Sequence, residues 1–290
     1  MHEFLRSIGL RSLHTKEELR RLTEWVTEAP EDMAITDAGA DDNVAEATRF
    51  FAGGAGVTVV GSVREDGSVI PEYYFPCLKT DVISSDKVVN VDRLQTREGF
   101  AGMCDDPRVG TPLIFNVRNV VDAERDFEDN EFETAFHSVS FGMLLSDATI
   151  VLPLIPEARM TEEKREEMDR RREEAMREAE TSPEAFSEYA KNAIDEYERF
   201  LYHMQNTDIL SMVDSFLMPY GLESECYYIL GTILSEEDYF NELTGERYYR
   251  MTVEVNGITL SAVVNEADLT GIPQEGCRIR AHGWLQGFVS

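Results

Sequence analysis

Basic residues are scarce in this 290-residue chain. It has 27 lysines and arginines against 56 aspartates and glutamates, which gives a formal net charge of -29. A field of that sign repels the phosphate backbone of nucleic acids, so nucleic-acid binding through the general surface is disfavoured. A basic, cationic or neutral partner, either a protein or a small ligand, suits this charge better.

Cysteine and histidine patterns typical of metal or disulfide sites are also lacking. The four cysteines, Cys77, Cys104, Cys226 and Cys277, lie far apart, with no CxxC pair and no histidines at zinc spacing. We therefore predict neither a disulfide framework nor a structural zinc site. The chain also contains no GxSxG elbow, no Walker loop and no HExxH motif, so we predict no catalytic residue, metal or cofactor.

Long apolar runs are missing as well. The longest, Ala148 to Ile155, is interrupted by Pro153 and is far shorter than the roughly 18 to 20 residues of a membrane span. The opening residues Met1 to Arg6 contain no apolar core of the kind that a secretory signal has. We therefore expect no membrane association and a cytoplasmic protein.

What is present is enough for a packed α+β protein, since 42% of the residues are hydrophobic. We predict an N-terminal domain over residues 1–160 with an antiparallel sheet and helices. A helix capped by Thr15 is expected over residues 16–28, and a second helix is expected over Asn43 to Phe51. The glycines at 53, 54 and 56 precede a strand, whereas a dinucleotide-binding loop follows one.

Strand patterns dominate the rest of this domain. Val57 to Val63 and Val69 to Phe75 read as a hairpin around an Asp-Gly turn. Further strands are predicted at Val88 to Leu94, Pro112 to Val121, Phe136 to Leu145 and Ala148 to Leu154. The last two strands are expected to be joined by a turn at Ser146-Asp147.

A helical segment is predicted over residues 161–221. Residues 162–180 are nearly all charged, with glutamates and arginines at the spacing of helix surface pairs. A second helix follows Ser182, with one apolar stripe formed by Phe186, Tyr189, Ala193, Tyr197, Phe200 and Met204. A third piece, Asp208 to Met218, ends at a boundary marked by Pro219-Tyr220-Gly221.

Residues 222–290 are predicted to form a small β-barrel. Strands are expected at Cys226 to Leu234, Arg247 to Val255, Ile258 to Val264 and Cys277 to Val289. Asn256-Gly257 is a hairpin turn, and Asn265 to Leu269 suits a short helical crossing. The pattern resembles the oligonucleotide/oligosaccharide-binding (OB) barrel. That fold has five strands, so the barrel is either incomplete or completed by the preceding domain.

The chain as a whole resembles an uncharacterised protein family of anaerobic gut Firmicutes. The resemblance is clearest in the opening stretch MHEFLRSIG, residues 1–9. No activity is established for that family. The resemblance implies a bacterial cytoplasmic protein and favours no particular enzyme class.

The last predicted strand carries the candidate binding residues. Period-two alternation separates Ile279, Ala281, Gly283 and Leu285 from a basic and aromatic face. The predicted binding residues are Arg278, Arg280, His282, Trp284 and Phe288, extended by Tyr248 and Arg250. Such a face can stack rings or grip an acidic peptide, or it can pack against the rest of the chain.

Two weaker candidates lie earlier in the chain. His137 is expected on the solvent face of its strand, and a general-base role would need a carboxylate beside it. A dense acidic stretch consists of Asp122, Asp126, Glu128, Asp129, Glu131 and Glu133. Because this stretch lacks EF-hand spacing, we interpret it as solvated charge and not as a calcium site.

Three functional hypotheses follow. The first is a non-enzymatic binding or assembly protein that uses the barrel as its contact module. The second is an enzyme of unrecognised type, hydrolase-like, with a pocket between the N-terminal sheet and the helices where His137 meets carboxylates. The third, a single-stranded nucleic-acid binder, rests on fold analogy alone.

Overall fold

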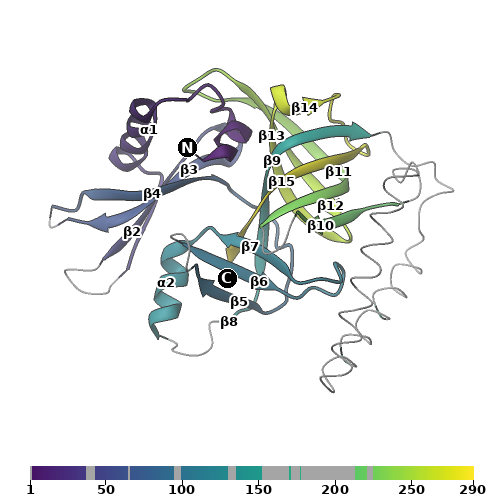
Figure 1. Ribbon diagram of the computed structural model, residues 1–290, viewed down its shortest axis with the longest axis horizontal. Helices are drawn as coiled ribbons and strands as arrows, with labels where there is room; N and C mark the ends of the chain where they lie inside the picture. The colour runs from purple at the N-terminus through teal and green to yellow at the C-terminus, as the bar shows by residue number, and fades with distance from the viewer. Residues whose placement is uncertain are drawn as a thin grey trace.

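The described part of the protein contains a four-stranded sheet and an eleven-stranded sheet, part of which closes into a barrel (Figure 1). The computed structural model describes residues 2–36, 43–64, 66–94, 99–129, 135–151, 170, 177, 213–220 and 225–290. In chain order the elements are η1 (Glu3–Ile8), α1 (Lys16–Glu28), β1 (Asp32–Ile35), β2 (Val44–Phe50), η2 (Ala52–Gly54), β3 (Ala55–Val63), β4 (Val69–Leu78), β5 (Val89–Arg93), β6 (Phe100–Cys104), β7 (Leu113–Val117), α2 (Val120–Asp129), β8 (Ala135–Phe136), β9 (Val139–Val151), β10 (Phe216–Pro219), β11 (Cys226–Phe240), β12 (Arg247–Val255), β13 (Ile258–Asn265), η5 (Glu266–Asp268), β14 (Leu269–Thr270) and β15 (Arg278–Val289). Strands dominate this α+β arrangement.

The helix predicted over residues 16–28 is confirmed as α1. Thr15 accepts a hydrogen bond from the Glu18 backbone N–H at 3.2 Å, and the Glu18 carboxylate accepts one from the Thr15 N–H at 2.8 Å. This capping box satisfies two N–H groups that would otherwise lack partners at the start of the helix. The helix buries Leu22 and Val26 against β2, β3 and β4.

The helix predicted from Asn43 to Phe51 is wrong, because Val44–Phe50 is strand β2. It lies between β1 and β3, antiparallel to both, in the order β1-β2-β3-β4. Ala45 and Ala47 are buried with period-two spacing, which is the pattern of a strand. Alanine and glutamate favour helices locally, and here pairing on both sides overrides that preference.

The predicted hairpin between β3 and β4 is confirmed, with Val63 opposite Val69. The strand predicted at Val88 to Leu94 is confirmed as β5. The strand predicted from Pro112 to Val121 is shorter than expected: β7 ends at Val117, and α2 begins at Val120. Sequence patterns missed β1 and β6, which are only four and five residues long.

The turn predicted at Ser146-Asp147 is wrong. Val139–Val151 is one continuous strand, β9, paired along its length with β15. The register shifts where His282 faces Asp147 and Gly283 faces Leu145, so Ser146 is the extra residue of a β-bulge. A β-bulge accommodates one extra residue without ending the strand, so polar residues with the composition of a turn can lie within a strand. The bulge also bends the strand around the barrel.

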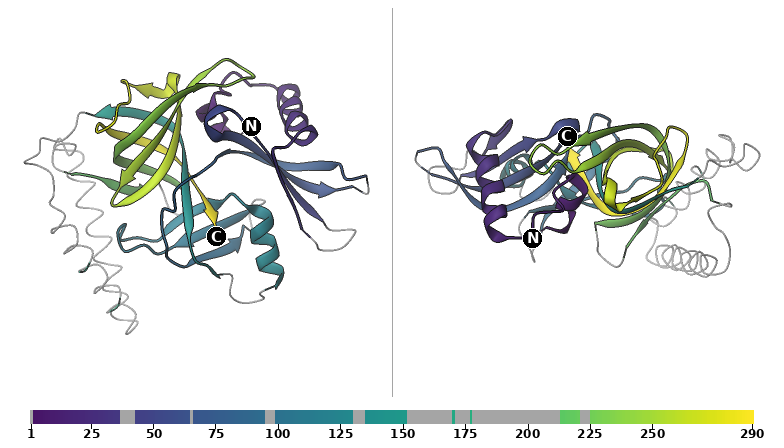
Figure 2. Two further views of the ribbon diagram at one scale, coloured as in Figure 1. Left: turned by 180° about the vertical axis from the view of Figure 1, so that it is seen from behind. Right: turned by 90° about the horizontal axis from the view of Figure 1, so that it is seen from above.

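The barrel closes through five strands, seen end-on in the right-hand view of Figure 2. β11 pairs with β12, β12 with β13, β13 with β9, β9 with β15, and β15 with β11. The four predicted strands are confirmed, and the fifth, β9, comes from the preceding part of the chain. β9, which was predicted as part of the antiparallel N-terminal sheet, is antiparallel to β15 but parallel to β13.

Local signals in the barrel are confirmed as well. Asn256 and Gly257 have φ values of 51° and 74°, and both residues are therefore in the left-handed region that a tight hairpin turn requires. Glu266–Asp268 forms the predicted short helical crossing as η5. Apolar side chains that share one side of the paired strands fill the barrel: Met143, Leu145, Ile229, Ile233, Met251, Val253, Leu260, Ala262, Ile279 and Leu285.

A second core lies outside the barrel wall, where the N-terminal elements cover it. Phe4 and Leu5 of η1 and Leu78 of β4 are buried together with Leu144 and Val263, which lie on the outer side of β9 and β13. Because the wall is covered here, both sides of these strands are apolar. The barrel and the N-terminal part therefore share one continuous core.

The predicted helical segment lies mostly outside the described residues, including its apolar stripe. Arg170 and Arg177 are helical. Phe216–Pro219 is strand β10, antiparallel to β11, so the helix predicted up to Met218 is wrong over its last residues.

Candidate binding site on the barrel wall

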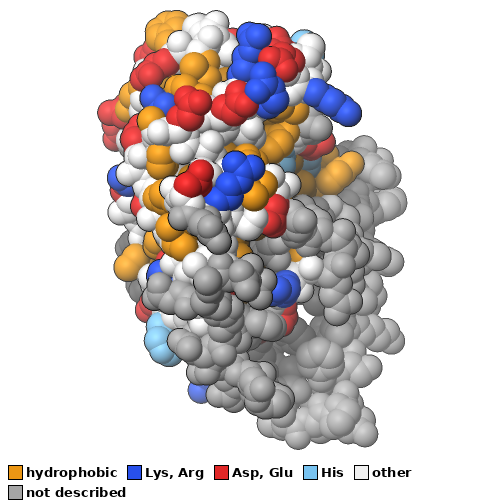
Figure 3. Space-filling model, turned by 90° about the vertical axis from the view of Figure 1, so that its left-hand side faces the viewer, with side chains coloured by type: hydrophobic (Ala, Val, Ile, Leu, Met, Phe, Trp, Pro, Cys, Tyr) orange, Lys and Arg blue, Asp and Glu red, His pale blue; other side chains and the backbone are white. Residues whose placement is uncertain are grey.

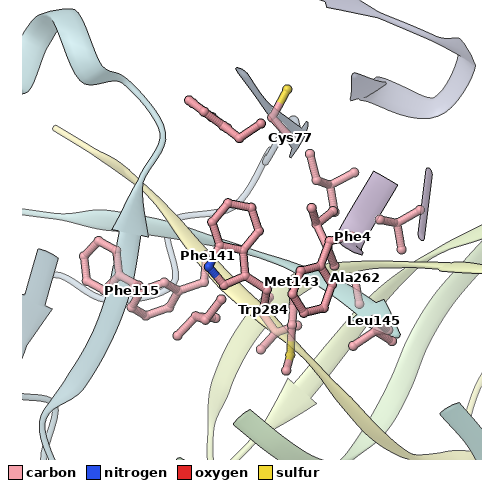
Figure 4. Close-up of a cluster of buried hydrophobic side chains, with 14 of the residues drawn as sticks. Phe4, Cys77, Phe115, Phe141, Met143, Leu145, Ala262 and Trp284 are labelled. Atoms are coloured by element: carbon pink, nitrogen blue, oxygen red, sulfur yellow. The ribbon is translucent and has the colours of Figure 1, made fainter. Parts of the chain in front are cut away.

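The predicted face of β15 is divided between covered and exposed parts. Trp284 is only 3% exposed and stacks on Phe4, with ring centroids 5.7 Å apart and planes at 21°. The His2 ring lies 4.6 Å from the indole on another side. Figure 4 shows Phe4 and Trp284 next to each other, within a cluster that continues to Phe141 and Phe115. Trp284 is thus part of the core between the barrel and the N-terminal segment.

Tyr248 and Arg250 of β12 also face the chain's own N-terminal part. Tyr248 is buried and donates its hydroxyl hydrogen to the Ala52 carbonyl. Arg250 donates to the carbonyl of Gly53 at 3.0 Å and is paired with Asp81. These two residues hold η2 and the end of β4 against the barrel, so their side chains serve an internal interface.

Arg278 and Phe288 mark the two ends of the strand. Arg278 is 5% exposed and donates to the Val213 carbonyl at 3.1 Å. Phe288 is half-buried beneath the Arg118 guanidinium, which lies 5.0 Å from its ring centroid. Both side chains therefore contact the rest of the chain.

Arg280 and His282 remain accessible, and the fold brings two tyrosines to them. Tyr228 of β11 lies directly across from His282 of β15, and its side chain is 41% exposed. Tyr220, just after β10, is 53% exposed and is held in place by its backbone N–H, which donates to Cys226 at 2.7 Å. We name Tyr220, Tyr228 and His282 the aromatic platform.

The three rings of the platform contact one another. The centroid distances are 5.2 Å for Tyr220 and Tyr228, 4.8 Å for Tyr220 and His282, and 4.9 Å for Tyr228 and His282. Such spacings are those of direct ring contact, so no ligand fits between the rings. A partner would instead pack on their outward faces.

His282 contributes a neutral ring to the platform. Its Nδ1 lies 3.0 Å from the Ser146 hydroxyl, which belongs to the bulge in β9. Burial lowers the pKa of His282, although Glu3 and Asp147 act in the opposite direction. The imidazole is therefore neutral at neutral pH, and the fixed positive charge beside the platform is that of Arg280.

Sequence reasoning found Arg280 and His282 but missed both tyrosines. A signal for Tyr228 did exist, because alternation places it on the side of its strand opposite Tyr227 and Ile229. Whether Tyr228 lies next to His282 depends on the register between β11 and β15. The sequence alone does not give that register. Tyr220 was interpreted only as part of a domain boundary.

A second cluster lies where the four-stranded sheet meets α2. The half-buried Glu46 of β2 accepts a hydrogen bond from the Val121 N–H at 3.1 Å, at the start of that helix. Burial raises the pKa of Glu46 to about 7, although the N–H groups of α2 and the charge of Arg118 favour the carboxylate. Glu46 thus joins two layers of the fold through one titrating group.

Replacing Glu46 with glutamine should change how stability depends on pH. A pKa raised from 4.5 in the unfolded chain to about 7 means that the stability due to the neutral acid is fully present below pH 4.5 and lost as pH rises through 7. Between pH 5 and pH 9, the free energy of unfolding of Glu46→Gln should gain about 2 to 3 kcal/mol relative to the unmodified protein. Urea unfolding at both pH values measures this gain, with the exposed Glu72→Gln as control; equal pH dependence in all three proteins would contradict it.

The two weaker candidates do not form a site among the described residues. His137 is exposed, as expected, and lies beside Ser290, where its backbone N–H donates to the Ser290 carbonyl at 2.9 Å. Asp122 accepts a hydrogen bond from Asn119 at 2.9 Å, and the side chains of the other five acidic residues lie outside the description. In the described part of the chain, no group of three or more possible metal ligands gathers.

The described residues define a strand-rich protein with an exposed aromatic cluster, the platform, on its barrel wall. A family model matches residues 5–287, and the chain belongs to that family: DUF3881, a domain of unknown function described from an E. rectale gene. The resemblance to an uncharacterised family is therefore confirmed. Neither a curated protein nor a solved structure matches the chain. Among helices in the described ranges, none has the length and apolar character to cross a membrane.

Proposed function

We propose that the protein is a non-enzymatic cytoplasmic binding or assembly protein and that the aromatic platform is its contact surface. The observation that carries this proposal is the exposure of Tyr220 and Tyr228, 53% and 41%, in rings already fixed against each other and against His282. Rings that are held in place lose little conformational entropy when a partner covers them. Exposed tyrosines beside an arginine are typical of the residues that contribute most to protein interfaces.

The strand pairing supports an OB-type barrel with a permuted chain. In an OB barrel the first strand pairs with the second and the fourth, and the third pairs in parallel with the fifth. β11, β12, β13 and β15 take the first four places, and β9 is parallel to β13, as a fifth strand would be. Since β9 precedes the others, we propose a circularly permuted OB-type barrel.

This permutation favours a contact surface away from the usual one. OB barrels bind their ligands over the second and third strands. In this chain the outer sides of β12 and β13 carry Tyr248, Arg250 and Val263, which contact or are buried beneath the chain's own N-terminal part. The outer sides of β11 and β15 carry Tyr228 and His282, which contact Tyr220, so we place partner binding there.

The shape of the site favours a protein partner over a small ligand. Small molecules are usually bound in concave pockets that enclose most of their surface. The platform instead projects from the outer wall of the barrel, with rings in direct contact. The family match names no activity, which leaves the hydrolase-like and single-stranded nucleic-acid alternatives without a supporting observation.

Photo-crosslinking from the platform tests the proposal. With p-benzoylphenylalanine in place of Tyr220, illumination of native cells should give one discrete adduct between this protein and a partner. Tyr228→Ala in the same protein should remove at least about 80% of the adduct, because the ring that supports position 220 is lost. Leu243 is similarly exposed, at 47%, but lies in the turn between β11 and β12, so it is the control position. Adducts of equal yield at both positions, or at neither, would refute the platform as the contact surface.

A further inference from the structure

Arg280 sits beside the platform with its side chain exposed and forms no ion pair with any described residue. We infer that the partner places a carboxylate on Arg280 and an aromatic side chain on the platform, two residues apart in an extended peptide segment. This inference rests on the proposed function and specifies the chemistry of the partner at that site.

Charge pairing elsewhere on the barrel makes Arg280 unusual. Arg247 pairs with Asp238 at 3.0 Å and with Glu266 at 3.1 Å, and Arg250 pairs with Asp81. On the face in Figure 3, basic and acidic side chains also lie next to one another over the described part of the surface. The chain has 56 acidic residues, and none of those that the structure describes forms an ion pair with Arg280.

The register of the barrel sets the spacing of the two contacts. Tyr228 faces His282, and Arg280 faces Leu230, so Tyr228 and Arg280 are diagonal neighbours across β11 and β15. Such neighbours lie about 7 to 8 Å apart. Side chains on one face of an extended peptide recur every two residues, about 7 Å apart. A ring and a carboxylate at positions i and i+2 therefore match Tyr228 and Arg280.

Two acidic residues, Asp147 and Glu3, also lie near His282, but neither stands between Arg280 and Tyr228. Asp147 is exposed and faces His282 from β9, so β15 separates it from Tyr228 by two strand spacings, about 10 Å. Glu3 acts on His282 from the same N-terminal side. Arg280 is the basic residue diagonal to Tyr228 across β11 and β15, and a guanidinium binds a carboxylate through two parallel hydrogen bonds. The net charge of -29 repels the many phosphates of a nucleic acid, whereas a peptide with one carboxylate meets much weaker repulsion.

Two matched tripeptides test this chemistry by NMR. The probes are N-acetyl-Trp-Ala-Glu-amide and N-acetyl-Trp-Ala-Gln-amide, titrated into the full-length protein with 13C-labelled histidine rings. The chain has five histidines, so the His282 signal is assignable with the His282→Asn variant. We expect the His282 signal to shift with both peptides and the glutamate peptide to bind about three- to fivefold more tightly, the effect of one exposed ion pair.

Arginine variants separate the carboxylate contact from a general charge effect. Arg280→Met should abolish the difference between the peptides, whereas Arg21→Met, at a 72% exposed arginine on α1, should preserve it. Equal binding of both peptides to the unmodified protein would overturn the carboxylate contact and leave the proposed function intact. A larger response to oligo-dT than to the glutamate peptide would overturn the peptide partner in favour of a nucleic acid. If neither peptide shifts His282, this inference fails, and the adduct at position 220 separately decides the proposed function.

Discussion

Replacing Trp284 with alanine is expected to lower the free energy of unfolding by about 3 to 5 kcal/mol. The indole is 3% exposed, stacks on Phe4 and lies against His2, so its removal leaves a cavity between β15 and the N-terminal segment. Most of the lost energy is the transfer of the large apolar side chain together with the contacts that line the cavity. Urea unfolding monitored by far-UV circular dichroism measures the change.

Tyr220→Ala is the matched control, because Tyr220 is another aromatic residue of the barrel surface. It is 53% exposed, so its removal should cost less than about 1 kcal/mol. This pair of variants separates a core role, that of Trp284, from a surface role, that of Tyr220. Equal losses of stability in the two variants would mean that Trp284 is not part of the core.

Asp106→Ala is expected to cost about 3 to 4 kcal/mol. Its fully buried carboxylate accepts hydrogen bonds from the Ser85 hydroxyl and from Arg108 Nη2, both at 2.6 Å, and from Arg108 Nε at 2.9 Å. Arg108 in turn donates to the Gly257 carbonyl at 2.8 Å, so this cluster joins the β6–β7 connection to the β12–β13 hairpin. Thermal unfolding of Asp106→Ala beside the exposed Asp105→Ala measures the effect, and Asp105→Ala should stay within about 0.5 kcal/mol of the unmodified protein.

The same carboxylate predicts a loss of stability in acid. Burial alone would raise the pKa of Asp106, but hydrogen bonds from Arg108 and Ser85 lower it below the ordinary value of 3.8. Its stabilising contribution is therefore present above pH 3.8 and is lost as pH falls through the lowered value. Asp106→Ala should lack this acid dependence, and an unchanged dependence in the variant would show that other groups cause it.

Four of the five barrel strands were predicted from turn residues and period-two alternation. Both patterns depend only on residues that are close together in the sequence. Asn256-Gly257 has the positive φ angles of a two-residue hairpin, and the strands on either side follow period-two alternation. The fifth strand was harder to assign, since β9 precedes β11 by a long stretch of chain and is selected by tertiary pairing. The sequence could say only that the set of strands was incomplete within residues 222–290.

Tertiary pairing also explains the errors. The residues of β2 favour a helix locally, and the sheet overrides them. Ser146-Asp147 has the composition of a turn, yet β15 pairs on both sides of it and turns it into a bulge. In the last strand, alternation correctly separated two faces, but it could not show that the N-terminal segment covers Trp284 while Arg280 stays exposed.

The candidate site was therefore predictable only in part. Arg280 and His282 followed from alternation along one strand, whereas Tyr228 joins them through the register of a neighbouring strand. Tyr220 joins through the short strand β10, whose pairing with β11 positions it. A site assembled from three strands depends on contacts that are distant in sequence, and single-strand periodicity does not contain them.

The central claim is that Tyr220 and Tyr228 serve a partner while Trp284 serves the fold. The most direct test is the yield of the adduct from position 220 in the Tyr228→Ala protein, measured together with the midpoint of its urea unfolding. We predict that the yield falls by at least about 80% while the midpoint stays close to that of the unmodified protein. An unchanged yield, or a loss of yield that accompanies unfolding, would contradict the claim.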